Sequence, residues 1–234
     1  MYFYRRILEA SGFFQDGPGY GVDPYRTQKD LGLAQAGQVL AQGFPGGEAS
    51  LSQWIHLSLW ANQADLSLWP AGAEGGGKAP GGGGHEHLLV DQHMAALAHL
   101  AAANGGRVEW LLDNFGSELC FDLLLADALL AQYPRLSLRF HVKPHPCFVS
   151  DVTAADLPHA LRWLSTEAPA PAQHASQRLL QAEQEGRLQT ATHFYFASPS
   201  PAWEMPPDLR QELSGAALII SKGDVNYRRW LGDA

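Results

Sequence analysis

Three clusters of polar side chains each follow an apolar segment of the sequence. They are Asp113-Asn114, Ser150-Asp151 and Lys222-Gly223-Asp224. Carboxylate and amide oxygens suit a hard divalent cation such as Mg²⁺ or Mn²⁺, and they leave positions open for water and substrate. A cation held by Asp113, Asn114 and Asp151 would neutralise phosphate charge and make a bound water more acidic. These residues predict a metal site that could act on a phosphorylated molecule.

Other residues beside these clusters could help to bind phosphate. Gly116 opens a predicted helix, and the free N–H groups at that end would favour an anion. Lys222 and Arg228 could add charged donors. Glu118 could cap the same helix or accept a hydrogen bond from a residue of the site.

The apolar segments before the clusters have the pattern of β-strands, and helical patterns alternate with them. Strands are predicted at residues 108–113, 136–142, 193–197 and 216–221. Helices are predicted at residues 88–103, 116–132, 154–165, 173–185 and 207–213. This alternation predicts an α/β fold with a mainly parallel sheet and helices on both faces. Because ligands bind outside the carboxyl ends of the strands in such sheets, the three clusters should meet at one rim.

Composition divides the chain into three regions. Residues 1–70 are predicted to be mostly helical, residues 71–86 form a glycine-rich insertion, and residues 87–234 form the α/β metal-binding domain. The insertion has too few apolar side chains to build a core, which favours a flexible surface segment.

Each polar cluster also has an ordinary structural explanation. Asp113-Asn114 could cap the helix that follows Gly116, and Ser150-Asp151 could cap the helix from Ala154. Lys222-Gly223-Asp224 could be a charged turn. The case for a shared site depends on all three clusters lying at the carboxyl ends of strands.

The charge of the chain excludes some partners. The net charge is −8 with only 16 Lys and Arg residues, whereas binding to a nucleic-acid backbone needs clustered positive charge.

No apolar stretch reaches the roughly 18 residues that a membrane span needs, and no secretory signal follows Met1. Cys120 and Cys147 do not indicate a disulfide. The expected location is cytoplasmic, with the nucleus as an alternative, and the oligomeric state stays open.

The same clusters belong to longer segments that resemble a known family. Residues 111–130, 140–153 and 218–233, with the motifs DNxGxE and KGDxNYR, are similar to the damage-control phosphatases. Subfamily III of this family is also named acidic residue methyltransferase. Weaker similarity at residues 2–10, 23–29 and 58–68 extends the resemblance over nearly the whole chain.

The resemblance implies a fold, an activity and a set of site residues. The family fold is a three-layer α/β/α domain with a helical N-terminal region. Its members remove phosphate from small sugar phosphates such as fructose 1-phosphate and fructose 6-phosphate, with Mn²⁺ as the first expectation and Ni²⁺, Co²⁺ or Mg²⁺ as alternatives. The resemblance assigns catalysis and metal binding to Asp113, Asn114 and Asp151. It assigns substrate contact to Asp113, Asn114, Asp224, Val225, Asn226, Tyr227 and Arg228.

The sequence departs from the family pattern at its ends. Members of subfamily III carry an Arg-Thr-x-Lys motif downstream of KGDxNYR, and no counterpart precedes Ala234. The run Arg26-Thr-Gln-Lys29 spells the motif but aligns with a different family segment, so we interpret it as coincidence. The helical region that usually precedes YRRI is also missing. A shortened, non-catalytic domain is therefore one alternative function.

Two further choices stay open. A carboxyl methyltransferase that uses S-adenosylmethionine is the other alternative function, although no glycine-rich loop follows an early strand to hold that cofactor. For a phosphatase, the attacking group could be a water bound to the metal, or Asp113 itself through an aspartyl-phosphate.

Overall fold

Four strands form a single sheet within residues 2–43, 49–64, 88–103 and 105–232, which the computed structural model describes. The strands are β1 (Gly106–Leu111), β2 (Leu136–Val142), β3 (Leu188–Thr192) and β4 (Leu218–Ser221). Their order is β3-β2-β1-β4, and each neighbouring pair is parallel. Trp110 of β1 is paired with Phe140 of β2 and with Ile220 of β4. The predicted parallel sheet is confirmed, and its carboxyl ends lie at one edge.

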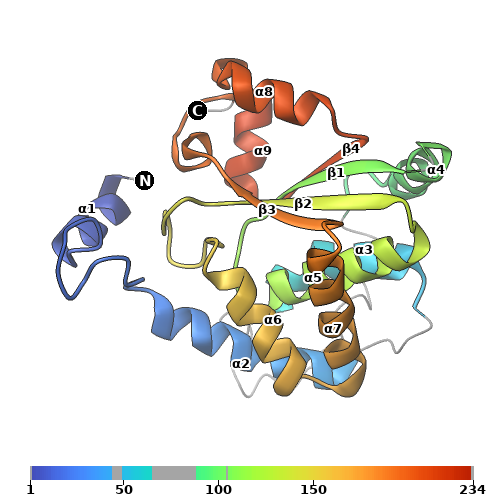
Figure 1. Cartoon of the computed structure of the whole chain (residues 1–234), viewed down its shortest axis with the longest axis horizontal. Helices are drawn as coiled ribbons and strands as arrows, with labels where there is room; N and C mark the ends of the chain where they lie inside the picture. Colours follow the sequence, from blue (N-terminus) through green and yellow to red (C-terminus); the bar gives the residue numbers. More distant parts are fainter. Residues whose placement is uncertain (1, 44–48, 65–87, 104, 233–234) are drawn as a thin grey trace.

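Helices cover both faces of this sheet (Figure 1). In this view α3, α5, α6 and α7 lie below the sheet, and α8 and α9 lie above it. The helices are α1 (Tyr2–Ala10), α2 (Arg26–Gly43), α3 (Leu51–Trp60), α4 (His93–Ala103), α5 (Ser117–Gln132), α6 (Asp156–Thr166), α7 (Ala170–Gln184), α8 (Pro207–Ser214) and α9 (Asp224–Leu231). Short 3₁₀ segments are η1 (Ala61–Ala64), η4 (Phe194–Ala197) and η5 (Ala202–Glu204). The three-layer α/β/α fold and the helical N-terminal region are thus confirmed.

The helix α5 lies at the centre of the main core because its sequence is apolar on nearly every side. A helix of this kind must be covered all round. Leu119, Phe121 and Leu123 are completely buried, and α5 packs against α2, α3, α7 and β2. A second, smaller core cluster includes Leu209 and Leu213 of α8, at the other face of the sheet. The strand β1 therefore has packed layers above and below it.

The strand predicted at residues 193–197 is wrong. The third strand is β3, five residues earlier in the chain, and residues 194–197 form the 3₁₀ segment η4. The aromatic run favours a strand by propensity, but Tyr195 and Phe196 instead bury their rings in the second core cluster. The Nδ1 atom of His193 accepts a hydrogen bond from the Tyr195 backbone N–H at 3.0 Å, which stabilises the turn.

The helix predicted from residue 88 begins later, at His93. The backbone N–H of His93 donates to Asp91 Oδ1 at 3.2 Å, so the Asp91 side chain, one position before the N-cap residue Gln92, satisfies the first free N–H of the helix. The other predicted helices from residue 116 onward agree with α5, α6, α7 and α8 within a few residues.

The predicted division of the chain stays a prediction. The insertion at residues 71–86 lies outside the described residues, so the proposed boundary between residues 1–70 and 87–234 has no structural description. Across the described ranges, no helix has both the length and the apolar character needed to cross a membrane.

Candidate active site

The loops after β1 and β4 meet at the carboxyl edge of the sheet. The strand β1 has β2 on one side and β4, which comes much later in the chain, on the other, and such a switch in strand order is where α/β sheets bind ligands. Gly223 lies directly against Asp113: a Cβ at Gly223 would sit 2.1 Å from Asp113 Cγ. The backbone at Gly223 also has a φ of +84°, which favours glycine. This edge, with the loops at Asp113, Asp151 and Gly223, is called the rim below.

The loop that carries Asp151 runs beside the loop that carries Asp113 and Asn114. Asn114 and Asp151 form an isolated antiparallel β-bridge. The Val152 N–H donates to the Asp113 carbonyl at 2.9 Å. The Ser150 hydroxyl donates to Asn114 Oδ1 at 2.7 Å. The structure therefore brings together the three residues that the sequence predicts as metal ligands.

The alternative explanation of these residues as helix caps is wrong. The N-cap of α5 is Gly116 and that of α6 is Ala155, and no described side chain makes a cap hydrogen bond at either position. The side chains of Asp113, Asn114 and Asp151 are used elsewhere. Asn114 Nδ2 donates to Asp113 Oδ2 at 2.8 Å and to Glu118 Oε2 at 3.0 Å. The expectation that Glu118 accepts a hydrogen bond from a site residue is confirmed.

Burial raises the pKa values of Asp113 and Asp151 at the rim, and neighbouring carboxylates raise that of Asp113 further. Burial is the main cause for Asp113; Glu118, Asp151 and Asp224 add to it, and the pKa rises to about 7 although Lys143 opposes the change. Burial also raises the pKa of Asp151, opposed by Lys143. The rim thus holds more negative charge than its neighbours neutralise.

The donor set at the rim fits a hard divalent cation. Asp113 and Asp151 are 7% and 4% exposed. Among the described residues, Asp151 Oδ2 accepts no hydrogen bond, and the nearest cation, Lys143 Nζ, lies 3.9 Å away. Two buried carboxylates and an amide oxygen are the ligand types that Mg²⁺ and Mn²⁺ prefer. A bound dication would supply the charge that these carboxylates lack.

We expect the metal-free chain to lose stability as the pH rises from about 4 to about 7. The Asp113 carboxyl has a pKa of about 7 when folded, against about 4 in an unfolded chain. The folded state therefore holds the proton more tightly, so it is favoured at low pH and loses this advantage as the pH passes through the window. Urea unfolding across this range should show a flatter profile for Asp113→Asn than for the parent chain. Identical profiles would contradict the assignment.

Lys222, predicted as a phosphate donor, is instead committed to the protein interior. Its Nζ donates to the Ser58 carbonyl at 2.8 Å and to Asp122 Oδ1 at 2.9 Å, and it lies 3.3 Å from Glu118 Oε1. Burial alone would lower the Lys222 pKa, but Asp122 and Glu118 outweigh it and hold that pKa above its usual range. Glu118 also accepts a hydrogen bond from Asn114, so Lys222 stabilises the rim indirectly by holding Glu118 in place.

Residues 224–228, which the sequence predicts to contact substrate, form the start of α9, and their side chains differ in exposure. Tyr227 is 63% exposed, and Asp224 and Arg228 are also exposed, whereas Val225 is half-buried. Asn226 is buried: its Nδ2 donates to the Lys222 carbonyl at 2.9 Å, and its Oδ1 accepts from Arg229 at 2.7 Å. The Asn226 side chain therefore holds the rim loop, while the role of this run in substrate contact stays a prediction.

Gly223→Ala should destabilise the chain more than Gly186→Ala does. Both glycines have positive φ, +84° and +74°, which penalises alanine at both positions. At Gly223 the ψ of 158° also places the backbone in a region that is nearly restricted to glycine, where strain costs about 1–3 kcal/mol. The new methyl group at Gly223 would also overlap Asp113, whereas no described atom lies within 4 Å at Gly186. Overpacking adds about 1–3 kcal/mol. Urea unfolding of the two variants measures the difference, and equal losses would contradict the packing at the rim.

Charged residues of the N-terminal region hold α2 against the start of α6. Lys29 Nζ lies 2.7 Å from Asp156 Oδ2 and 2.8 Å from Asp23 Oδ2, and Arg26 donates to Asp156 Oδ1. Asp156 also accepts from the Thr153 N–H at 2.8 Å. Burial would raise the Asp156 pKa, but Lys29 outweighs it and the pKa is lowered. The run at residues 26–29 thus has a structural role just beyond Asp151.

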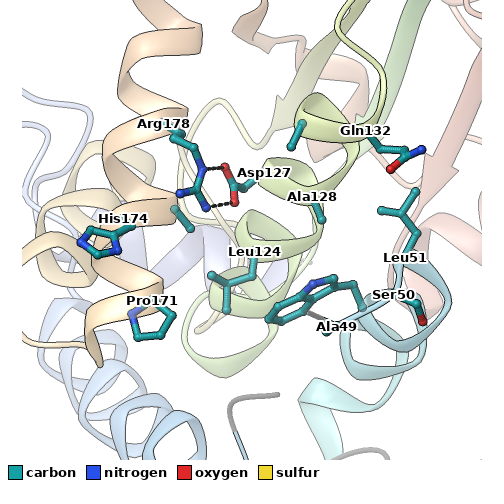
Figure 2. Close-up of a pocket in the computed structure, with 13 residues that line it drawn as sticks. Ala49, Ser50, Leu51, Leu124, Asp127, Ala128, Gln132, Pro171, His174 and Arg178 are labelled. Atoms are coloured by element: carbon teal, nitrogen blue, oxygen red, sulfur yellow. Dashed lines mark hydrogen bonds and ion pairs between the residues drawn. The ribbon is translucent and has the colours of Figure 1, made fainter. Parts of the chain in front are cut away.

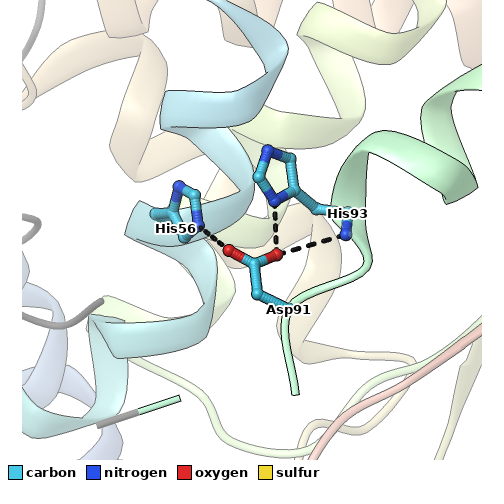
Figure 3. Close-up of side chains that lie close together, drawn as sticks. All are labelled: His56, Asp91 and His93. Atoms are coloured by element: carbon cyan, nitrogen blue, oxygen red, sulfur yellow. Dashed lines mark hydrogen bonds and ion pairs between the residues drawn. The ribbon is translucent and has the colours of Figure 1, made fainter. Parts of the chain in front are cut away.

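A second group of possible metal ligands, missed by the sequence analysis, lies between α3 and α4 (Figure 3). His56, Asp91 and His93 each offer one ligand atom, and these atoms lie within 4.8 Å of one another. The only signal in the sequence is the close spacing of Asp91 and His93, because His56 comes from a distant helix. None of the three lies at the rim.

The structure also contains a cavity of about 450 Å³ among α3, α5 and α7 (Figure 2). Its wall combines apolar side chains such as Leu124 with the ion pair between Asp127 and Arg178, whose two N–H···O contacts are 2.8 and 2.6 Å. No predicted site residue lines it. The cavity is therefore separate from the rim.

Comparison with known proteins identifies relatives over the whole chain. The family model described as the damage-control phosphatase ARMT1-like domain matches residues 1–234. The protein named damage-control phosphatase ARMT1 from Rattus norvegicus is 30% identical over 99% of this chain and 58% of its own length. Its namesake from Danio rerio is 29% identical with the same coverage. The chain therefore spans less than two thirds of the length of these relatives.

A solved structure agrees with the fold. The crystal structure of a DUF89 family protein from Pyrococcus horikoshii matches with a TM-score of 0.57 and 16% identity, over 88% of this chain and 63% of that one. At this identity the match supports the architecture alone.

Proposed function

Because this chain belongs to the damage-control phosphatase ARMT1-like domain family, we propose that it is a metal-dependent phosphatase acting on phosphomonoesters of small sugar phosphates. The substrate would be of the fructose 1-phosphate or fructose 6-phosphate type, and the reaction would serve metabolite damage control. The names of the relatives support the reaction class. The motif KGDxNYR, at residues 222–228, agrees with this assignment to the family.

One observation carries the proposal: Asp113 and Asn114, which follow β1, lie side by side at the rim with Asp151, which comes from a loop much later in the chain. Burial and neighbouring carboxylates raise the pKa of Asp113 to about 7, and perturbed carboxyl groups of this kind cluster at functional sites. None of these three residues is the N-cap of α5 or α6. A site for a cation is the function that this arrangement fits best.

The same three residues would hold the cation, with Mn²⁺ expected first and Ni²⁺, Co²⁺ or Mg²⁺ as alternatives. When bound, such a cation supplies positive charge that stabilises the phosphoryl oxygens during transfer. Asp113 must release its proton before its carboxylate can act as a ligand, so we expect weaker cation binding below a pH of about 7. The hydrogen bonds of Asn114 to Asp113 and Glu118 keep the Asn114 amide oriented for this role.

Exposed residues at the start of α9 would contact the substrate. Arg228 Nη2 lies 3.9 Å from Asp224 Oδ2 in a pair that solvent largely surrounds, so this contact contributes little to stability and both groups remain available to a ligand. Tyr227 could donate its hydroxyl to a sugar oxygen. The N-terminus of α5, which no described side chain caps, would favour the phosphate.

The test is phosphate release from a panel of sugar phosphates. The chain is stripped of metal with a chelator and assayed with and without Mn²⁺, with Ni²⁺, Co²⁺ and Mg²⁺ in parallel. We expect release that depends on the cation and is largest for a fructose phosphate. Absence of release with all four cations, in a sample that melts cooperatively, would contradict the proposal and favour a non-catalytic domain. Metal-independent binding of S-adenosylmethionine in calorimetry would favour the methyltransferase alternative.

A further inference from the structure

Two imidazole rings and a carboxylate converge where α3 meets the start of α4 (Figure 3). Asp91 Oδ1 lies 2.5 Å from His93 Nδ1, and Asp91 Oδ2 lies 3.5 Å from His56 Nε2. The two rings are 4.7 Å apart between centroids and nearly perpendicular. In Figure 3 a nitrogen of each ring points toward the carboxylate. The three possible ligand atoms thus surround one small volume.

We propose that His56, Asp91 and His93 form a second metal site, which binds Zn²⁺. Two imidazole nitrogens and one carboxylate oxygen suit Zn²⁺, with a fourth tetrahedral position for water. The all-oxygen set at the rim suits harder cations instead. The two sites would therefore select different metals.

The spacing of the ligand atoms fits this ion. Zinc lies about 2.0–2.2 Å from nitrogen and oxygen ligands, so the ligand atoms of a tetrahedral site are roughly 3–3.5 Å apart. The contact of Asp91 with His56, 3.5 Å, agrees with this spacing, and no pair of ligand atoms exceeds 4.8 Å. The contact of Asp91 with His93, 2.5 Å, is a direct hydrogen bond, which must lengthen to admit the ion. Small side-chain rotations would place all three ligands around one ion.

A fourth residue orients one of the rings as a metal site requires. The Ser52 hydroxyl lies 2.7 Å from His93 Nε2, the ring nitrogen that faces away from Asp91. In the metal-free chain Nδ1–H donates to the Asp91 carboxylate. When zinc binds, Nδ1 would give up this proton and present its lone pair to the metal, while Nε2–H would donate to Ser52; partners of this kind fix ligand histidines in known sites. The hydrogen bond from the first N–H of α4 to Asp91 would explain only the position of the carboxylate. It requires neither the second imidazole nor Ser52.

The proposed zinc site has one buried ligand, His56, and is open to solvent at Asp91. His56 is 6% exposed, whereas Asp91 is exposed and His93 is half-buried. Two residues after His56, Ser58 accepts hydrogen bonds from Lys222. Zinc would therefore hold in place the helix that supports the rim.

The test measures zinc alone in a chain whose rim is disabled. Asp113→Asn serves as the background, so that zinc at the rim is not counted. After treatment with a chelator and dialysis against Zn²⁺, atomic emission should find one ion per chain, and zinc should raise the melting temperature. Adding His56→Ala or His93→Ala should remove this ion and the shift. Adding His99→Ala, on the same helix but outside the group, should leave both unchanged.

Two milder variants keep the test decisive if an alanine variant fails to fold. Asp91→Asn keeps an oxygen that can cap α4 but loses the anionic ligand, and it should weaken zinc binding by about tenfold or more. Ser52→Ala should weaken it by roughly 10- to 100-fold, as loss of a partner of a ligand histidine does. Full zinc content in the His93→Ala or Asp91→Asn variant would overturn the proposal. So would absence of zinc from the Asp113→Asn chain, or equal loss of zinc in the His99→Ala variant.

Discussion

Asp113→Asn should lower kcat/KM for metal-dependent phosphate release by roughly 10²- to 10³-fold, the loss that follows removal of one preorganised group that stabilises charge. The substitution keeps the shape of the side chain. Its amide oxygen can still accept the hydrogen bond that Asn114 Nδ2 donates to Asp113 at 2.8 Å. What it removes is the negative charge that would bind the cation. Steady-state kinetics with titrated Mn²⁺ measures this loss.

The same substitution should stabilise the metal-free chain. Burial and the nearby carboxylates of Glu118 and Asp151 oppose ionisation of Asp113 and raise its pKa to about 7. Replacing a strained buried charge with a neutral amide removes that penalty above neutral pH. Asp16→Asn, at an exposed carboxyl between α1 and α2, is the control and should change neither activity nor stability appreciably. Near-parental activity of Asp113→Asn, or lower stability without metal, would contradict this account.

Lys222→Met should reduce the free energy of unfolding by about 3–5 kcal/mol, the cost of breaking a buried ion pair from one side. The substitution leaves Asp122 and Glu118 buried without the cation that lies 2.9 and 3.3 Å from their oxygens. The Ser58 carbonyl would also lose the hydrogen bond that Lys222 Nζ donates. Urea unfolding at neutral pH measures the effect.

Arg228→Met is the matched control, because Arg228 lies close to Lys222 in the chain but its side chain is 62% exposed. Removal of such a surface cation should change stability by about 1 kcal/mol or less. Adding Asp122→Asn and Glu118→Gln to Lys222→Met should recover much of the loss, since the uncompensated charges are then gone. A Lys222→Met variant as stable as the Arg228→Met variant would show that the pair does not act as described.

The strands that could be predicted are those with short apolar runs, which is the pattern of a parallel sheet covered by helices. Strands β1 and β2 have such runs and are largely buried, and β4 has one although it is an edge strand whose residues are only half-buried or exposed. The edge strand β3 has the sequence Leu-Gln-Thr-Ala-Thr, with exposed polar residues, so no apolar pattern marks it. The aromatic run after it was the stronger signal and led to the wrong assignment. In this chain only the tertiary packing of Tyr195 and Phe196 distinguishes the two segments.

The placement of the candidate site could be predicted because topology brings strand ends together. Asp113, Asn114 and Asp151 needed only the order of strands and loops to become neighbours. The partners of Lys222 could not be predicted in this way, since Ser58 comes from α3, far away in the sequence. The proposed zinc ligands could not be predicted for the same reason, since they too come from segments far apart in the sequence. Contacts between helices with no shared pattern become visible only once the helices are packed.

The strand β4 pairs with β1 along only four residues and has no described neighbour on its other side. If so short a strand separates from the sheet, ordinarily only a few backbone hydrogen bonds break. Here it would also withdraw Lys222, which follows directly after the strand, and leave Glu118 and Asp122 repelling each other inside the protein. Detachment of this edge and loss of the charge balance behind the rim would then be one cooperative event, so a chain with a partly open sheet could not keep the loops of the rim in the arrangement described.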